Sequence, residues 1–200
     1  MIVILTIFSL IAGLACGFFG LGDTVFSVVR EHTDLILYVL MFCVGIMIGM
    51  REGILAKIKE YHLRIFIIPA GIMAGSLLGG ALCAMLLKLP LNQGAAVAGG
   101  MGWYSLAGAT ISNLCGAEMG SIAFLSNLMR EIFSFFIIPF LAVRFNYYTC
   151  IAPAGATSED TTLPMMLKYT NEETVVLSVL NGIICSFFVP ILIALFLGTA

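Results

Sequence analysis

Charge is what this sequence has least of. Only 10% of its 200 residues are charged and 61% are hydrophobic, whereas about a quarter of the residues in soluble domains are charged. A soluble fold of this length could not bury so much apolar surface, so the chain is predicted to lie in a lipid bilayer. The net charge of −2 provides no basic face for phosphates, which argues against nucleic acid as a partner.

Motifs for catalysis and metal binding are also missing. There is no H-E-x-x-H sequence, and His32 and His62 both fall in predicted loops. Ser105 and Ser158 have only carboxylates as candidate bases, so an enzyme is not expected, and no cofactor or metal is predicted. The six cysteines form no C-x-x-C pair and are expected to be small packing residues. They are Cys16, Cys43, Cys83, Cys115, Cys150 and Cys185.

Apolar runs long enough to cross a bilayer, about 20 residues each, recur along the whole chain. They predict an all-α integral membrane protein with about seven crossings in a single membrane domain, residues 1–200. The first run lacks the basic start of a cleaved signal and is expected to be a span. The predicted spans are Met1–Phe19, Asp34–Met50, Leu63–Leu87, Leu91–Leu114, Gly116–Val143, Ile151–Tyr169 and Glu172–Leu197.

The positions of the basic residues predict the orientation. The connector Arg51–Arg64 holds Arg51, Lys57, Lys59 and Arg64, out of nine basic residues in all, and basic connectors stay in the cytoplasm. Counting the spans from this connector places the N-terminus in the cytoplasm. The same count places Lys88, the loop Arg144–Thr149 and the C-terminus outside.

Two adjacent charged residues fall near the middle of the predicted span Gly116–Val143. An ionised group at that depth costs about 3 kcal/mol, so Arg130 and Glu131 need a reason to be there. Asn127, Arg130, Glu131 and Ser134 are three and four residues apart and share one helix face. An Arg–Glu pair that only joins helices is one interpretation. We favour the other, in which the stripe is a wall of a hydrated site.

The run Pro153–Pro164 interrupts the predicted span Ile151–Tyr169. It contains hydroxyl groups and two carboxylates, Glu159 and Asp160, between two prolines. Irregular backbone at membrane depth occurs only where it is buried in protein or lines water, and transporters use such broken helices to bind ions and substrates. A discontinuous helix is therefore predicted. The alternative is a loop outside the membrane, with one crossing fewer.

Two further segments are candidates. The run Gly99–Gly108 is rich in glycine, which helix packing explains, but it also holds Trp103, Tyr104 and Ser105, so packing and a binding role both stay open. Leu21–Thr24, which includes Asp23, resembles Ser158–Thr161, and a repeated interrupted span suggests an inverted-repeat transporter fold.

Three ordered segments, Gly102–Gly108, Asn127–Glu131 and Gly155–Pro164, resemble the lysine exporter (LysO) family. The similarity covers roughly Leu63 to the C-terminus. It implies secondary active export of L-lysine by proton antiport, in the inner membrane of a bacterial or archaeal cell. The family uses intramembrane acidic residues, and the matching positions here are Glu131 and Asp160, with Glu159 adjacent.

Single-chain members of that family are longer at the N-terminus, and this chain resembles the large polypeptide of a split, two-chain form. In an inverted repeat with about five spans in each half, residues 1–50 would end the first repeat and residues 63–199 would form the second. A small membrane subunit would then supply about three further helices. Pairs of this kind could assemble as a homodimer.

If lysine is the substrate, the chemistry of its charged groups indicates roles for individual residues. Ammonium groups of lysine and protons would compete for Glu131, Asp160 and Glu159, because a carboxyl in low-dielectric surroundings binds either. Arg130 would bind the substrate carboxylate or keep one acid ionised. The alternatives are a sodium-coupled or anion carrier of the bile-acid-symporter-like superfamily, and a non-transporting assembly subunit. The candidate substrate-binding residues are Asn127, Arg130, Ser105, Tyr104, Trp103, Thr157, Ser158, Thr161 and Asp23.

Overall fold

The computed structural model describes residues 66–198, together with positions 8, 11–13, 15, 16, 18, 35, 39, 42 and 46. Apart from those positions, the predicted spans Met1–Phe19 and Asp34–Met50 lie outside the described residues, as do Asp23 and the connector Arg51–Arg64. The chain divides into two compact units, Met1–Val44 and Gly45–Ala200. All of residues 66–198 belong to the second unit.

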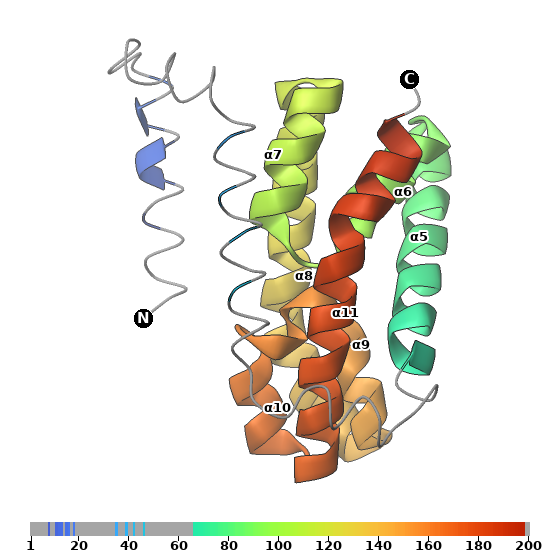
Figure 1. The fold of residues 1–200 in the computed structure, drawn as a ribbon, viewed down its shortest axis with the longest axis vertical. Helices are drawn as coiled ribbons and strands as arrows, with labels where there is room; N and C mark the ends of the chain where they lie inside the picture. Colours follow the sequence, from blue (N-terminus) through green and yellow to red (C-terminus); the bar gives the residue numbers. More distant parts are fainter. Residues whose placement is uncertain are drawn as a thin grey trace. The chain divides into compact units, whose positions relative to one another are not determined.

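Residues 66–198 form helices and no strand (Figure 1). Three of the helices are long and apolar enough to cross a bilayer, α5, α8 and α11. They coincide with three of the predicted spans. The elements in chain order are α5 (Ile67–Leu87), α6 (Leu91–Gly99), α7 (Tyr104–Cys115), α8 (Ala117–Arg144), η2 (Tyr147–Cys150), α9 (Ile151–Ala154), η3 (Gly155–Glu159), α10 (Leu163–Tyr169) and α11 (Glu172–Leu197).

The three long helices alternate in direction. At one end of the bundle, the amide of Asn92, just after α5, donates to the carbonyl of Phe196 near the end of α11 (3.4 Å). At the other end, the Tyr148 hydroxyl, just after α8, donates to Glu173 in the first turn of α11 (2.9 Å). Lys88 and Arg144 therefore lie at opposite ends, called here the Lys88 end and the Arg144 end. The prediction that both loops face the same side is wrong.

The predicted span Leu91–Leu114 is a helical hairpin. Helix α6 packs against α5, with Gly94 touching Gly80, and it ends where Gly99 meets Leu77 in the middle of α5. Helix α7 then returns along α8, where a Cβ on Gly120 would lie 2.4 Å from the Cβ of Ser112 (Figure 1). The prediction of one crossing here is wrong, because the chain reverses at Gly100–Trp103.

A second hairpin enters from the Arg144 end. The thiol of Cys150 donates to the carbonyl of Ile138, near the end of α8 (3.7 Å). From there α9 leads inward, η3 forms the tip, and α10 leads back to the start of α11. Between Pro153 and Pro164 the backbone is a short helical turn, a 3₁₀ helix and a turn. Both ends of Ile151–Tyr169 lie at the same end of the bundle, so the prediction that this segment crosses is also wrong.

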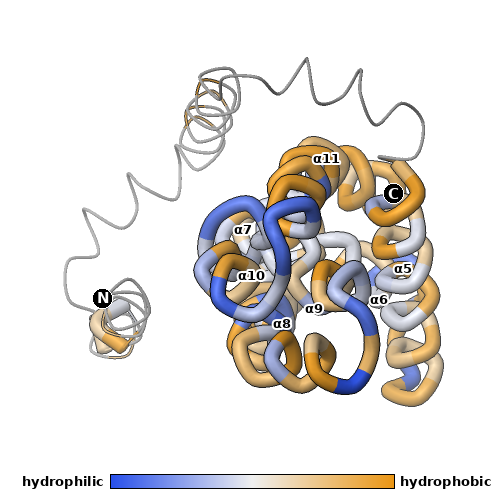
Figure 2. Tube along the Cα trace, turned by 90° about the horizontal axis from the view of Figure 1, so that it is seen from below, coloured by the Kyte–Doolittle hydropathy of each residue, from blue (hydrophilic) through white to orange (hydrophobic). Residues whose placement is uncertain are grey.

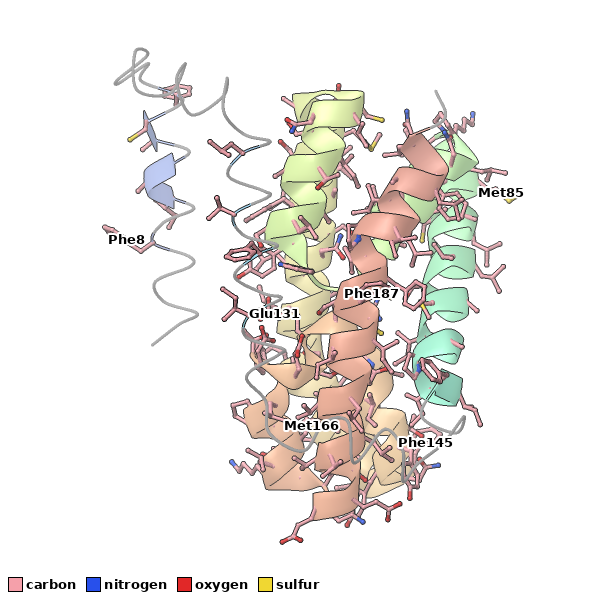
Figure 3. All side chains as sticks on the ribbon, viewed as in Figure 1. Phe8, Met85, Glu131, Phe145, Met166 and Phe187 are labelled. Atoms are coloured by element: carbon pink, nitrogen blue, oxygen red, sulfur yellow. The ribbon has the colours of Figure 1, made fainter. Side chains whose placement is uncertain are left out.

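The outer surface of the bundle suits lipid. Apolar side chains such as Met85 on α5 and Phe187 on α11 point outward and are 63% and 62% exposed (Figure 3). Hydrophilic residues gather instead in the loops around α10 and the start of α11 (Figure 2). Within the described part of the chain, the cysteines form no disulfide.

Candidate functional site

The tips of the two hairpins touch each other. The amide of Ala156 in η3 donates to the carbonyl of Met101, between α6 and α7 (2.9 Å). Gly102 and Gly155 have left-handed backbone conformations, with φ of +100° and +59°. A Cβ on Gly155 would lie 2.4 Å from the Met101 oxygen, so only glycine fits at this contact. Chain segments from opposite ends of the bundle therefore meet in its interior.

Asn127 on α8 holds the tip of the first hairpin. Its amide oxygen accepts from the backbone N–H of Gly102 (2.8 Å), and its amide nitrogen donates to the carbonyls of Val97 (2.8 Å) and Ala123 (2.9 Å). The side chain is buried, and its bond to Gly102 satisfies an N–H that the break between α6 and α7 leaves without a helical partner. In this structure the Asn127 amide therefore stabilises the tip of the first hairpin.

Arg130, one turn further along α8, holds the second hairpin. Its guanidinium donates to the carbonyls of Ala152 (3.1 Å) and Pro153 (3.3 Å), in the last turn of α9, and to the Ser76 hydroxyl on α5 (2.8 Å). A cation at the C-terminal end of a helix is favourable because the exposed carbonyls carry partial negative charge. The structure thus joins α5, α8 and α9 through one side chain.

Glu131 points to a different part of the second hairpin. Its side chain is buried, with the Thr161 hydroxyl and the carboxylate of Asp160 close enough to act on it. Asp160 is itself exposed and accepts a bond from the Thr161 hydroxyl (3.3 Å). Figure 3 places Glu131 about midway along the bundle. The structure therefore brings together two of the predicted coupling acids, and it forms no ion pair between Arg130 and Glu131.

The third predicted acid faces elsewhere. Glu159 is 3% exposed and accepts a bond from the Ser186 hydroxyl on α11 (3.1 Å). Its backbone lies so close to α11 that a Cβ on Gly182 would be 2.6 Å from the Glu159 nitrogen. Glu159 and Asp160 are neighbours in the sequence, but the first packs on α11, whereas the second is close enough to Glu131 to act on its charge.

Two hydroxyl groups that were predicted to bind substrate, those of Ser158 and Thr157, form hydrogen bonds within the protein. The Ser158 hydroxyl bonds to the Ser178 carbonyl (2.8 Å) and accepts from the Asn181 amide (3.0 Å). The Thr157 hydroxyl donates to the carbonyl of Ala154 (2.8 Å). Sequence reasoning missed Ser178 and Asn181, which secure the hairpin to α11. Their signal was present, since polar residues at helical spacing in an apolar span share one face.

The aromatic segment lies at the start of α7. Tyr104 meets Phe124 of α8 edge to face, with ring centroids 5.2 Å apart. Trp103 is half-buried and its backbone N–H donates to the Gly100 carbonyl (2.8 Å), which closes the turn. Ser105 is exposed. These three residues thus belong to the tip of the first hairpin.

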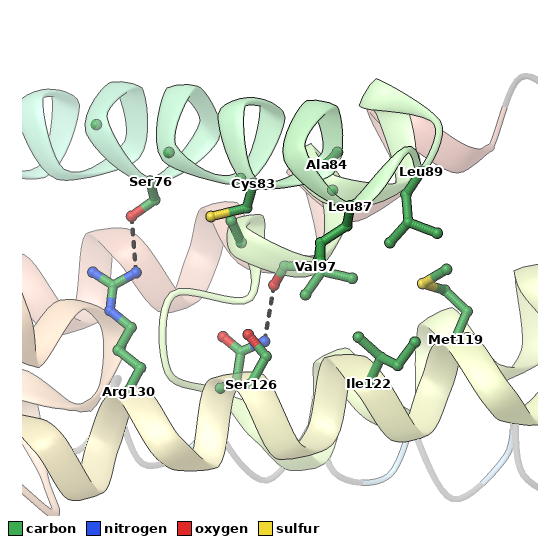
Figure 4. A pocket seen from close by; sticks show the side chains of 16 residues that line it. Ser76, Cys83, Ala84, Leu87, Leu89, Val97, Met119, Ile122, Ser126 and Arg130 are labelled. Carbon is green, nitrogen blue, oxygen red and sulfur yellow. Dashed lines mark hydrogen bonds between the residues drawn. The ribbon is translucent and has the colours of Figure 1, made fainter.

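A cavity of about 490 Å³ lies between α5, α6 and α8. Figure 4 shows Arg130 and Ser76 at one end of it, and Leu89 and Met119 at the other. Because Leu89 and Met119 are near the Lys88 end, the cavity extends from that end toward the middle of the bundle. Its lining is mostly apolar, and Arg130 is its charged residue.

Residues 7–197 match the model of a protein family described as lysine exporter LysO. The chain belongs to the LysO family. The lysine exporter LysO of Escherichia coli (strain K12) is 36% identical over 186 residues, which cover 93% of this chain and 61% of that protein. A putative lysine exporter of Haemophilus influenzae is 36% identical over 167 residues, which cover 80% of this chain and 82% of that protein.

This LysO-family chain spans about three-fifths of the length of its E. coli relative. No solved structure matches it. Family membership and the three apolar helices together make it a membrane-embedded, multi-pass protein. The hairpins, the two acids and the cavity are thus features of a LysO-family membrane domain.

Proposed function

We propose that this chain forms the transport site of an L-lysine exporter that works by proton antiport in the cytoplasmic membrane. The observation that carries the proposal is the pair Glu131 and Asp160 beside the junction of the two hairpins, far from both ends of the bundle. The names of the E. coli and H. influenzae relatives, both lysine exporters, support lysine as the substrate.

The chemistry of the two acids fits this exchange. A carboxylate in low-dielectric surroundings is costly unless a proton or another cation neutralises it. The buried Glu131, with the exposed Asp160 near it, therefore binds either a proton or an ammonium group of lysine. Arrival of a proton from outside releases the ammonium group, and arrival of lysine from the cytoplasm releases the proton. Competition for one pair of carboxyls is enough to couple the two movements.

The two hairpins supply a route for alternating access. One enters from the Lys88 end and the other from the Arg144 end, and their tips meet at the bond between Met101 and Ala156. Movement of either hairpin would open the acid pair toward one side while the other hairpin keeps the opposite side closed. With the basic connector Arg51–Arg64 in the cytoplasm, the Lys88 end and the C-terminus face outside.

A partner chain completes the proposed exporter. The chain aligns with about three-fifths of the E. coli relative, and the remaining part of that relative would correspond to a small membrane subunit. Such a subunit would supply helices of the first repeat, and two of the resulting pairs could form a homodimer. Transport by the chain alone is therefore compared with transport by the chain and its partner together.

The test is efflux of labelled lysine from proteoliposomes under an imposed inward proton gradient. Glu131→Gln and Asp160→Asn should each abolish proton-driven efflux, because an amide accepts hydrogen bonds but does not exchange a proton. Glu118→Gln is the matched control, since Glu118 is an exposed acid in the first turn of the same helix. Efflux that survives both acid variants would overturn the proposal. Efflux driven by a sodium gradient alone would replace the proton as the coupling ion.

A further inference from the structure

Among residues 66–198, no acidic side chain forms an ion pair with Arg130. Its hydrogen bonds go to the carbonyls of Ala152 and Pro153 and to the Ser76 hydroxyl, all of them neutral groups. A guanidinium has more N–H donors than these three bonds use. A half-buried cation with unused donors is unfavourable at membrane depth, so an anion at this position would be strongly attracted.

The cavity between α5, α6 and α8 gives an anion room beside Arg130. Arg130 and Ser76 lie together at its inner end, while the walls toward the Lys88 end are apolar (Figure 4). The space depends on two glycines of α5, Gly75 and Gly79, which line the cavity. A Cβ at either position would meet no atom within 4 Å, so these glycines leave a volume that larger side chains would fill.

We infer that this cavity binds the carboxylate of the exported amino acid, held by the Arg130 guanidinium with the Ser76 hydroxyl beside it. The inference rests on the proposed function and adds the position of the anionic group. A carboxylate matches the planar donors of a guanidinium, and such charge-assisted bonds are among the strongest in proteins.

This assignment separates the two kinds of charge on the substrate. Consecutive residues on a helix point about 100° apart, and here Arg130 faces α5 and α9 whereas Glu131 faces Thr161 and Asp160. The segment from Ala152 to Thr161 lies against both. An amino acid with a cationic side chain can therefore place its carboxylate at Arg130 and its ammonium group at Glu131 and Asp160, on either side of one hairpin. A diamine has no carboxylate and can occupy only the second of these sites.

Comparison of lysine with cadaverine, which is lysine without its carboxylate, tests the subsite. Each compound competes with labelled lysine for efflux by the complete exporter in proteoliposomes. The wild-type protein should prefer lysine by on the order of 10- to 100-fold, the factor expected from a hydrogen bond to a charged group. Arg130→Gln should erase this preference, and Arg130→Lys should retain part of it. Arg144→Gln, at an exposed arginine of the same helix, should leave it unchanged.

Filling the cavity tests the same inference without touching the bonds of Arg130. Gly75→Leu and Gly79→Leu should each weaken lysine binding at least tenfold. Gly71→Leu is the matched control, because Gly71 lies on the same face of α5 with equally open surroundings but does not line the cavity. Binding is followed by the fluorescence of Trp103, the only tryptophan, at the tip of the neighbouring hairpin.

The outcomes separate the explanations. A lysine preference that persists in Arg130→Gln, or lysine binding that persists in Gly79→Leu, overturns the inference. Equal damage from Gly71→Leu would mean that the glycine face of α5 packs against another helix instead. A preference that appears only in vesicles containing phosphatidylglycerol, and not in phosphatidylcholine, would assign the cavity to a lipid headgroup. Failure of the wild-type protein to export lysine would remove the proposed function, while the Trp103 titration would still report on the carboxylate.

Discussion

The carbonyl of Met101 accepts a 2.9 Å hydrogen bond from the amide of Ala156, and this bond joins the tips of two hairpins that enter the bundle from opposite ends. Met101 is fully buried and has a left-handed backbone conformation, with φ of 48°, which is uncommon for a residue with a side chain. The contact therefore places a strained turn and a glycine, Gly155, at the centre of the membrane domain. Asn127 and Arg130 hold the two tips from α8.

Loss of the Asn127 amide should destabilise the first hairpin. Asn127→Ala leaves the N–H of Gly102 without its partner, and leaves the carbonyl of Val97 with only the 3.3 Å bond from the Gly100 N–H. A buried group without a partner costs about 1–3 kcal/mol. Thermal unfolding of the purified protein in detergent measures this loss. Asn92→Ala is the control, because Asn92 is exposed and makes one long hydrogen bond of 3.4 Å. Equal unfolding temperatures for the two variants would contradict the role given to Asn127.

A methyl group on Gly182 should displace the second hairpin from α11. In Gly182→Ala the new Cβ would lie 2.6 Å from both the nitrogen and the Cβ of Glu159, and such overpacking costs about 1–3 kcal/mol. Gly71→Ala, on an open face of α5, should be neutral or stabilise the helix slightly, because alanine is the better helix former. Gly182→Ala should therefore lower the unfolding temperature, whereas Gly71→Ala should leave it unchanged or raise it slightly.

Glu159 and Asp160 should differ in their importance for transport. Asp160 is close enough to Glu131 to act on its charge. Glu159 instead accepts a bond from Ser186, and a glutamine at 159 can still accept it. Glu159→Gln should therefore retain much of the lysine efflux that Asp160→Asn loses. Efflux rates from proteoliposomes, measured at equal protein content, compare the two. Greater damage from Glu159→Gln would move the coupling acid from Asp160 to Glu159.

The hairpin fold of Leu91–Cys115 predicts which loops share a side of the membrane. Single cysteines at Lys88 and Glu118, introduced in a chain without its other cysteines, should react with an impermeant maleimide from the same side. A cysteine at Phe145, which is 65% exposed, should react from the opposite side. Reaction of positions 88 and 145 from the same side would instead show that Leu91–Cys115 crosses the membrane once.

Much of the fold could be predicted from the sequence. Long apolar runs predicted α5, α8 and α11 nearly to their ends, because a helix that faces lipid needs about 20 apolar residues. Charged residues in such a run stand out for the same energetic reason, and so Arg130, Glu131 and Asp160 could be singled out from the sequence alone. The sequence did not show that Arg130 and Glu131 contact different parts of one hairpin. That separation depends on where α5 and α9 lie around α8.

The sequence did not predict correctly which apolar segments cross the membrane, and this error has a physical cause. A run such as Leu91–Leu114 satisfies the bilayer equally well as one span or as a hairpin, because lipid requires only apolar side chains and paired backbone groups. The reversal is decided by contacts with other helices, in which Gly94 packs on Gly80 and Asn127 binds the open turn at Gly102. For the described part of the chain, the sequence by itself determined which helices are long and apolar enough to cross a bilayer and which charges fall within apolar runs. Tertiary contacts alone decided which segments cross and which of those charges meet.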